Sequence, residues 1–194
     1  MDDFNFAYYL EEMINYDRMT NSYKIFCLKS IIEFANNDQL SFSFSDLQAQ
    51  MIVNGWSYAK AGYNFGVSDK IPLVVKSICS SNKVILSHRE KLDQIYNFYS
   101  DEKNVKSHTL IRYVQYRLLS PFFDNEIKGV PDQKKNRLIE MLSHNSDICI
   151  YSIDGESCQL SLNKEWMRYL KSNYLIVNGW IENKINQYLI FKNH

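Results

Sequence analysis

Apolar residues that recur at helical spacing are the feature that most constrains the fold of this chain. The clearest case lies between the side-chain oxygens of residues 20–22 and the polar run at 36–38, and its apolar positions are Tyr23, Phe26, Cys27, Ile31 and Phe34. Steps of three and four residues place such side chains on one face of an α-helix. The sequence therefore predicts a helix over this segment.

Further segments carry the same spacing together with signals for helix starts. Ser45 with Gln48, and Ser87 with Glu90, match the capping box, in which the two residues satisfy each other's backbone N–H groups. The helix after Ser87 is expected to bury Leu92, Ile95, Tyr96 and Tyr99. We expect other helices to begin at Ser68-Asp69, Pro131-Asp132 and Asn163, with breaks near 80–82 and 172–173, and a short helix or ordered arm over 4–15.

The clearest strand pattern is a hairpin near the end of the chain. Strands over 148–153 and 156–162 flank Asp154-Gly155, a pair that is typical of two-residue hairpin loops. With that loop, one packed face would contain Cys149, Tyr151, Ile153, Cys158, Leu160 and Leu162. Cys149 would then lie opposite Leu160 rather than Cys158, so no disulfide is implied. A shorter strand is expected over 40–44.

Together these elements predict a mainly α (α+β) fold, with a helical, bundle-like body and one small antiparallel hairpin near residues 148–162. A length of 194 residues, of which 45% are apolar, suits a single domain over 1–194. The polar, charged link over 100–107 is the best candidate for a subdomain boundary.

Charge and cysteine usage bound the function classes. Residues 1–99 hold 9 Lys and Arg against 11 Asp and Glu, and the remainder holds 13 against 11, so the chain is not strongly basic and any nucleic-acid contact must be local. The four cysteines form no Cys-x-x-Cys pair, the first residues are acidic rather than a basic leader, and no apolar run is long enough for a membrane span. The sequence predicts a cytoplasmic protein without a membrane partner.

Motifs for self-contained catalysis are missing from the sequence. The four histidines are far apart, without ligand spacing to one another or to cysteine, and the glycines form neither a phosphate-binding loop nor a nucleophile elbow. We expect no metal site or cofactor in this chain. A catalytic site assembled from scattered residues stays open.

Residues 109–123 combine basic and aromatic side chains. Arg112 and Arg117 flank Tyr113 and Tyr116, and a Pro-Phe-Phe run ends the segment. Guanidinium groups match phosphate oxygens and aromatic faces accept bases, so the segment is a candidate phosphate-binding and stacking strip. The alternative is structural: the aromatic and leucine side chains fill a core while both arginines extend to the surface.

Several segments together resemble one family. The amino-terminal region of bacterial HNH endonuclease domain proteins is similar to this chain over residues 21–33, 44–56, 64–69, 109–123 and 174–189. The resemblance implies a DNA-directed role in restriction or mobile-element defence. Two departures stand out: Gln115 occupies a position where the family pattern has proline, and the chain stops at His194, where the catalytic module would follow. The chain is thus expected to be a fragment or a short relative, and any divalent metal would belong to the missing module.

The resulting hypothesis is a non-catalytic DNA-recognition or scaffold region that binds duplex DNA. Its candidate phosphate contacts are Arg112, Arg117, Lys128, Lys134, Lys135 and Arg137. For Lys134, Lys135 and Arg137, an ordinary solvated helix face is the slightly favoured interpretation. Two alternatives remain: a protein-interaction or regulatory subunit without nucleic-acid binding, favoured if apolar residues at 188–191 are exposed for a partner to cover, and a stand-alone enzyme of unrecognised type.

Overall fold

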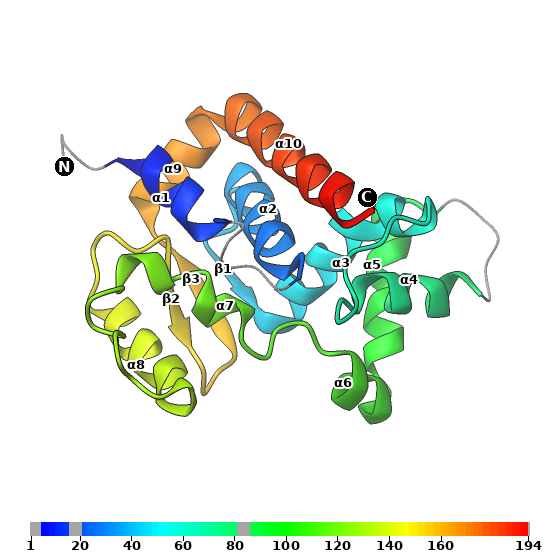
Figure 1. Cartoon of the computed structure of the whole chain (residues 1–194), viewed down its shortest axis with the longest axis horizontal. Helices are drawn as coiled ribbons and strands as arrows, with labels where there is room; N and C mark the ends of the chain where they lie inside the picture. The colour runs from blue at the N-terminus through cyan, green and yellow to red at the C-terminus, as the bar shows by residue number, and fades with distance from the viewer. Residues whose placement is uncertain (1–4, 16–20, 81–85, 194) are drawn as a thin grey trace.

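The computed structural model describes residues 5–15, 21–80 and 86–193 and is mainly helical (Figure 1). In chain order the elements are α1 (Phe6–Met13), α2 (Tyr23–Asn36), β1 (Ser41–Ser43), α3 (Phe44–Lys60), α4 (Ile71–Cys79), α5 (His88–Tyr99), α6 (Glu102–His108), α7 (Val114–Arg117), the 3₁₀ helix η2 (Ser120–Phe122), α8 (Asp132–His144), β2 (Tyr151–Asp154), β3 (Gln159–Leu162), α9 (Lys164–Ser172) and α10 (Tyr174–Asn193). The predicted mainly α, α+β class is confirmed. The strand expected over 40–44 is confirmed as β1, and it joins the predicted hairpin in one three-stranded sheet.

Helix α2 lies at the centre of the molecule (Figure 1) and packs against α3, α7, α9 and α10. Every residue from Ile25 to Ile32 is buried, so this helix is covered on all sides rather than along one stripe. The predicted helix is confirmed.

One charged side chain lies within this buried helix. Lys29 is 7% exposed, and its Nζ lies 2.7 Å from Glu182 Oε1 on α10 and 3.3 Å from Glu33 Oε1. Nζ also donates a hydrogen bond to Asn178 Oδ1 at 2.9 Å. Burial by itself would lower the pKa of Lys29, but the two carboxylates reverse this and raise it. Lys29 therefore connects the central helix to α10 as a paired charge.

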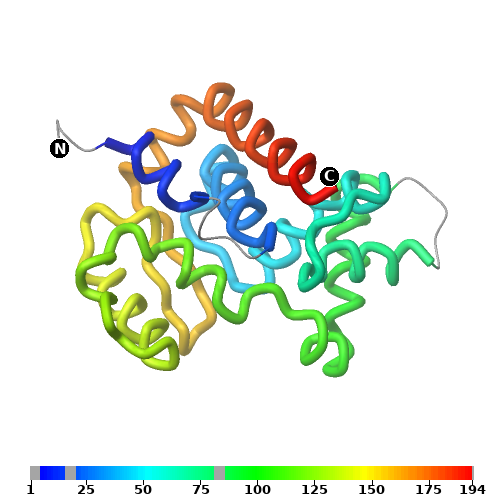
Figure 2. Tube along the Cα trace, viewed as in Figure 1, coloured from blue at the N-terminus to red at the C-terminus, as the bar shows by residue number. Residues whose placement is uncertain are grey.

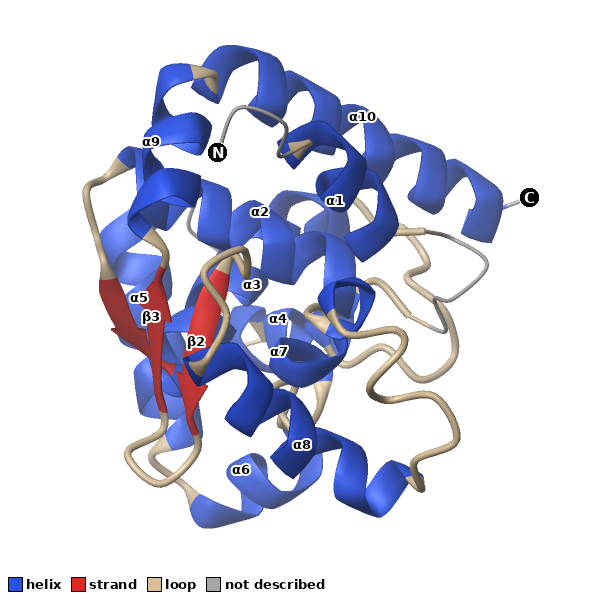
Figure 3. Ribbon diagram, turned by 90° about the vertical axis from the view of Figure 1, so that its left-hand side faces the viewer, coloured by secondary structure: helices blue, strands red, loops and turns tan. Residues whose placement is uncertain are grey.

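The three strands form an antiparallel sheet in the order β1-β3-β2, next to α8 (Figure 3). The hairpin is confirmed, but its loop contains the four residues 155–158 instead of two, so Ile153 pairs with Leu160 and Tyr151 with Leu162. The register differs from the predicted one by an even number of residues, so these four side chains still share the buried face. Cys158 leaves that face and is exposed at a φ of 55°.

Local capping confirms some helix starts and corrects others. Ser87 and Glu90 form the predicted capping box of α5. Helix α3 begins earlier than predicted, because Ser43, the last residue of β1, forms the capping box with Asp46. The expected polar link over 100–107 is mostly α6. Tyr96 is 41% exposed, contrary to the predicted buried stripe, because its hydroxyl reaches Asp46 Oδ1 at 2.7 Å.

Some predictions concern residues outside those that the structure describes. They are the helix-start oxygen at Thr20, the first residue of the expected 4–15 arm, and the break over 81–82. No helix in the described ranges combines the length and apolar character that a membrane span requires. A subdomain boundary near 100–107 stays a prediction.

Residues 109–123 join the two sides of the molecule. Figure 2 shows this green segment crossing from the side of α4 and α6 toward α8, and within it α7 contacts both α2 and α8. Phe122 is buried and stacks on Tyr9 of α1, with ring centroids 4.4 Å apart. We call residues 109–123 the seam. The structural alternative predicted for it holds in part, because its leucines and both phenylalanines are buried whereas Tyr113 is 49% exposed.

Candidate functional site

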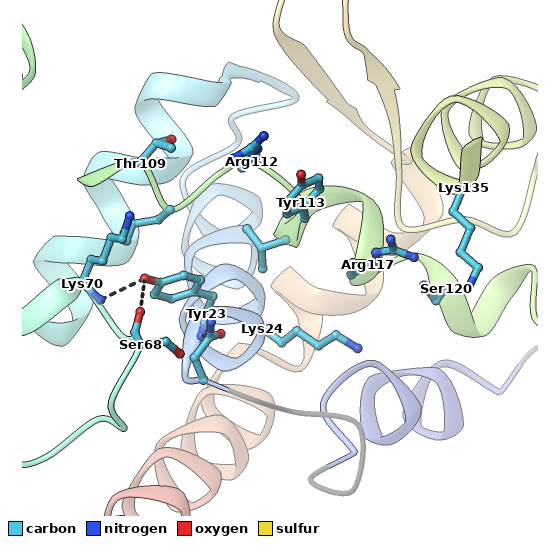
Figure 4. Close-up of a pocket in the computed structure, with 13 residues that line it drawn as sticks. Tyr23, Lys24, Ser68, Lys70, Thr109, Arg112, Tyr113, Arg117, Ser120 and Lys135 are labelled. Atoms are coloured by element: carbon cyan, nitrogen blue, oxygen red, sulfur yellow. Dashed lines mark hydrogen bonds between the residues drawn. The ribbon is translucent and has the colours of Figure 1, made fainter. Parts of the chain in front are cut away.

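A surface pocket of about 600 Å³ lies beside the seam, between the starts of α2 and α4 on one side and α8 on the other (Figure 4). It is lined by Asn21, Tyr23, Lys24, Ser68, Lys70, Thr109, Leu110, Arg112, Tyr113, Val114, Arg117, Ser120 and Lys135. Five of these residues are cationic and none is acidic. The pocket therefore concentrates positive charge in a chain whose formal net charge is zero.

Asp69 holds the starts of α2 and α4 together. The N–H and hydroxyl groups of Ser22 donate to Asp69 Oδ2 at 3.0 and 2.5 Å, and the N–H of Ile71 donates to Oδ1 at 3.0 Å. The predicted role of Asp69 at the start of a helix is confirmed for α4. Because the same carboxylate binds Ser22, which precedes Lys24 by two residues, it also brings Lys24 and Lys70 to one pocket.

Burial is the main influence on the pKa values of Asp69 and Tyr23, which lie where α2 and α4 begin. It raises the pKa of Asp69 to about 6, because the hydrogen bonds to the carboxylate offset only part of the cost of removing it from water. Burial also raises the pKa of Tyr23. The Tyr23 hydroxyl accepts from the N–H of Lys70 at 2.9 Å and donates to the carbonyl of Ser68 at 3.4 Å (Figure 4). Tyr23 thus contributes a neutral, already bonded hydroxyl.

Gln48 anchors the start of the seam. Its Oε1 accepts from the N–H of Leu110 at 2.8 Å and from the hydroxyl of Thr109 at 3.3 Å. The predicted capping role of Gln48 is wrong, because α3 starts at Phe44 and Asp46 takes that role. Gln48 instead reaches across 62 residues of sequence to position the backbone beside Arg112.

The middle of the seam is anchored from the sheet. The Tyr151 hydroxyl, on β2, donates to the carbonyl of Gln115 at 2.6 Å. Gln115 is itself 1% exposed, and its Oε1 accepts no hydrogen bond from the described residues. The backbone between Arg112 and Arg117 is therefore held by buried contacts, while both arginines remain at the pocket.

Arg117 and Lys135 share one carboxylate at the α8 side of the pocket. Asp132 Oδ1 lies 3.0 Å from Lys135 Nζ and 3.5 Å from Arg117 Nη2. The hydrogen bond and charge of Lys135, together with Arg117, hold the pKa of Asp132 below its usual value. One exposed carboxylate between two cations leaves net positive charge at this end.

Of the two tyrosines that line the pocket, Tyr113 is the exposed one. Its side chain is 49% exposed, and the Arg112 guanidinium carbon lies 5.2 Å from its ring centroid. Figure 4 shows Tyr113 between Arg112 and Arg117, with Lys70 and Lys135 at opposite sides. Leu110 and Val114 add buried apolar surface beside it.

The structure brings together half of the six cations predicted from the sequence. Arg112, Arg117 and Lys135 line the pocket, whereas Lys128, Lys134 and Arg137 are exposed and do not. The sequence did not identify Lys24 and Lys70 as site residues. In the sequence Lys24 follows Tyr23 and Lys70 follows Asp69, and both of these neighbours make tertiary contacts. No local motif marks either lysine as a site residue.

The described residues bear on two other kinds of chemistry, metal binding and thiol reactivity. Within them no cluster of three or more His, Cys, Asp and Glu side chains is arranged to hold a metal ion. All four cysteines are free. Burial raises the pKa of Cys27 and Cys149, which disfavours the reactive thiolate form.

The last helix has two kinds of apolar residue. Tyr188 and Leu189 are buried, and the Tyr188 hydroxyl donates to the carbonyl of Phe65 at 3.0 Å, so these two are not available to a partner. The exposed ones are Leu175 (86%), Ile176 (75%), Ile190 (55%) and Phe191 (75%). They lie at the two ends of α10.

The fold and pocket define a mainly helical α+β domain with a localised cationic site. No family model, curated protein or solved structure matches this chain. The resemblance to HNH endonuclease proteins therefore stays a prediction that rests on the sequence segments alone.

Proposed function

We propose that this chain is a non-catalytic DNA-recognition or scaffold region of an HNH-type nuclease system, acting in bacterial restriction or mobile-element defence. The observation that carries DNA recognition is the convergence of five cations on one pocket without an acidic lining residue. The resemblance supplies the nuclease and defence context. In this proposal, the protein acts in the cytoplasm and any divalent metal belongs to an associated nuclease module.

Phosphate is the ligand chemistry that this site fits best. Arginine presents a planar fork of N–H donors that matches two phosphate oxygens, and lysine adds point charges around it. Such contacts position a nucleic acid without reading its sequence. Since the whole chain has no net charge, attraction to DNA has to come from the local field of the pocket.

Replacing Arg112 and Arg117 with alanine tests this function. We expect DNA binding, measured by fluorescence anisotropy over a salt series, to weaken at least tenfold at low salt. The slope of log affinity against log salt should become shallower by about 2, because two phosphate contacts are lost. The fold should persist, because Arg112 is exposed and the ion pair of Arg117 is with the exposed Asp132.

Lys134→Ala combined with Arg137→Ala is the matched control. It removes the same charge from exposed positions on α8 outside the pocket, so we expect a much smaller loss. Equal losses in both double variants would reject the pocket as the site. Wild-type protein that does not bind DNA at low salt would reject DNA recognition itself.

The second candidate is a protein-interaction or regulatory subunit without nucleic-acid binding. Exposure of Leu175, Ile176, Ile190 and Phe191 favours it, because large apolar groups in water gain free energy when a partner covers them. This function predicts no salt-dependent DNA binding. The same titration therefore separates the two candidates.

A further inference from the structure

The pocket is built unlike a surface for a continuous duplex. It is a hollow of about 600 Å³, the size of a small-molecule site, with an exposed aromatic ring and apolar wall residues among its cations. A paired base keeps both faces within the helical stack, so a duplex offers phosphates but no free face to such a ring. A bound duplex would therefore use the cations of the pocket but not its exposed ring or its apolar residues.

The positions of the cations around Tyr113 indicate which ligand would stack on its ring. Lys70 lies to one side of Tyr113 and Lys135 to the other (Figure 4), and Arg112 and Arg117 flank the ring along the chain. In a single strand, each nucleotide has one phosphate on its 5′ side and one on its 3′ side. Positive charge on both sides of one aromatic ring matches that order of phosphate, base and phosphate.

We infer that the pocket binds an unpaired nucleotide of single-stranded DNA. Its base stacks on Tyr113, and its two flanking phosphates contact the cations on either side. This inference rests on the proposed DNA recognition and specifies the form of DNA that the pocket binds, which is unpaired rather than duplex.

Replacing Tyr113 with alanine is the direct test. The probes are a fluorescent thymidine homopolymer of about twelve nucleotides, which cannot pair with itself, and a duplex of equal length. We expect wild type to prefer the single strand, and Tyr113→Ala to lower single-strand affinity about tenfold while duplex affinity stays within about twofold. Tyr113→Phe should retain wild-type binding, because stacking needs the ring rather than the hydroxyl.

Tyr63→Ala is the control. Tyr63 is also exposed (44%) but does not line the pocket, so its loss should change neither affinity. Duplex binding at least as tight as single-strand binding, or single-strand binding insensitive to Tyr113→Ala, would overturn the inference and leave the proposed function standing. Tighter binding of the matching uridine ribonucleotide strand would overturn the assignment to DNA. Failure of both DNA probes to bind at low salt would overturn the inference and the proposed function together.

Discussion

At the scale of single residues, Asp69 connects stability to the pocket. Asp69 is 4% exposed, and its hydrogen bonds join Ser22, just before α2, to Ile71, the first residue of α4, so that Lys24 and Lys70 lie close to these two helix starts. A buried carboxyl group whose pKa is raised takes up a proton more readily in the folded state than in the unfolded chain. The stability of the protein must therefore depend on pH through this residue.

Asp69→Asn measures that dependence. As the pH rises from 4 to 7, the free energy of unfolding of wild type should fall relative to that of the variant. The reason is that the folded protein binds the proton of Asp69 up to a pKa of about 6, against 3.8 in the unfolded chain. The relative fall should be about 2–3 kcal/mol over that pH range, with no further change above it, since the shift spans about two pKa units. Urea denaturation at several pH values provides the comparison, and parallel curves would contradict it.

At the scale of elements, close contact between helices depends on glycine. Gly55 of α3 faces α4, and an added Cβ would lie 2.7 Å from Cγ2 of Ile71, which is fully buried. Gly179 of α10 has no neighbour within 4 Å of the same position. Both glycines lie within helices, so they differ in the packing around them and not in backbone conformation.

Gly55→Ala should lower the free energy of unfolding by about 1–2 kcal/mol, because the displaced Ile71 costs more than alanine gains in helix propensity. Gly179→Ala should raise it by about 0.5–1 kcal/mol, because only the propensity gain applies. Urea denaturation of both variants checks the pair. A stabilised Gly55→Ala protein would show that α4 moves freely on α3.

At the scale of the whole molecule, an ionic network around the buried Lys29 joins α2, α3 and α10. Lys29 on α2 contacts Glu182 on α10, and the Tyr58 hydroxyl on α3 donates to the same carboxylate at 2.9 Å. A buried charge that loses its partner is costly, whereas removing both charges costs less. The network thus fixes how α10 lies on the core.

Lys29→Met should destabilise the protein by about 2 kcal/mol, since it leaves the carboxylates of Glu182 and Glu33 without their cation. Adding Glu182→Gln should restore part of that loss. Lys106→Met is the control: its ion pair with Glu102 is exposed on both sides and should contribute at most a few tenths of a kcal/mol. Thermal unfolding of these variants would show the order, and a double variant less stable than Lys29→Met would contradict it.

The sequence by itself determined what depends on near neighbours in the chain. The limits of most helices, the capping box at Ser87, the break at Asn173 and the buried face of the hairpin all follow from signals within a few residues. The predicted hairpin loop was two residues too short, yet the paired residues of β2 and β3 still share the predicted buried face. The reason is that the register shifts by an even number of residues and side chains alternate along a strand. Arg112 and Arg117 were also recognisable, since they share one short aromatic segment.

Only the tertiary structure decided which cations meet. Lys24 and Lys70 reach the pocket because Asp69 bonds to Ser22 across 47 residues, and the seam lies beside them because Gln48 bonds to Leu110 across 62. Lys134 and Arg137 have the same charge and a similar sequence context as Lys135, yet α8 directs only Lys135 into the pocket. Local propensity acts over a few residues, whereas a site made from four segments depends on how buried surfaces pack.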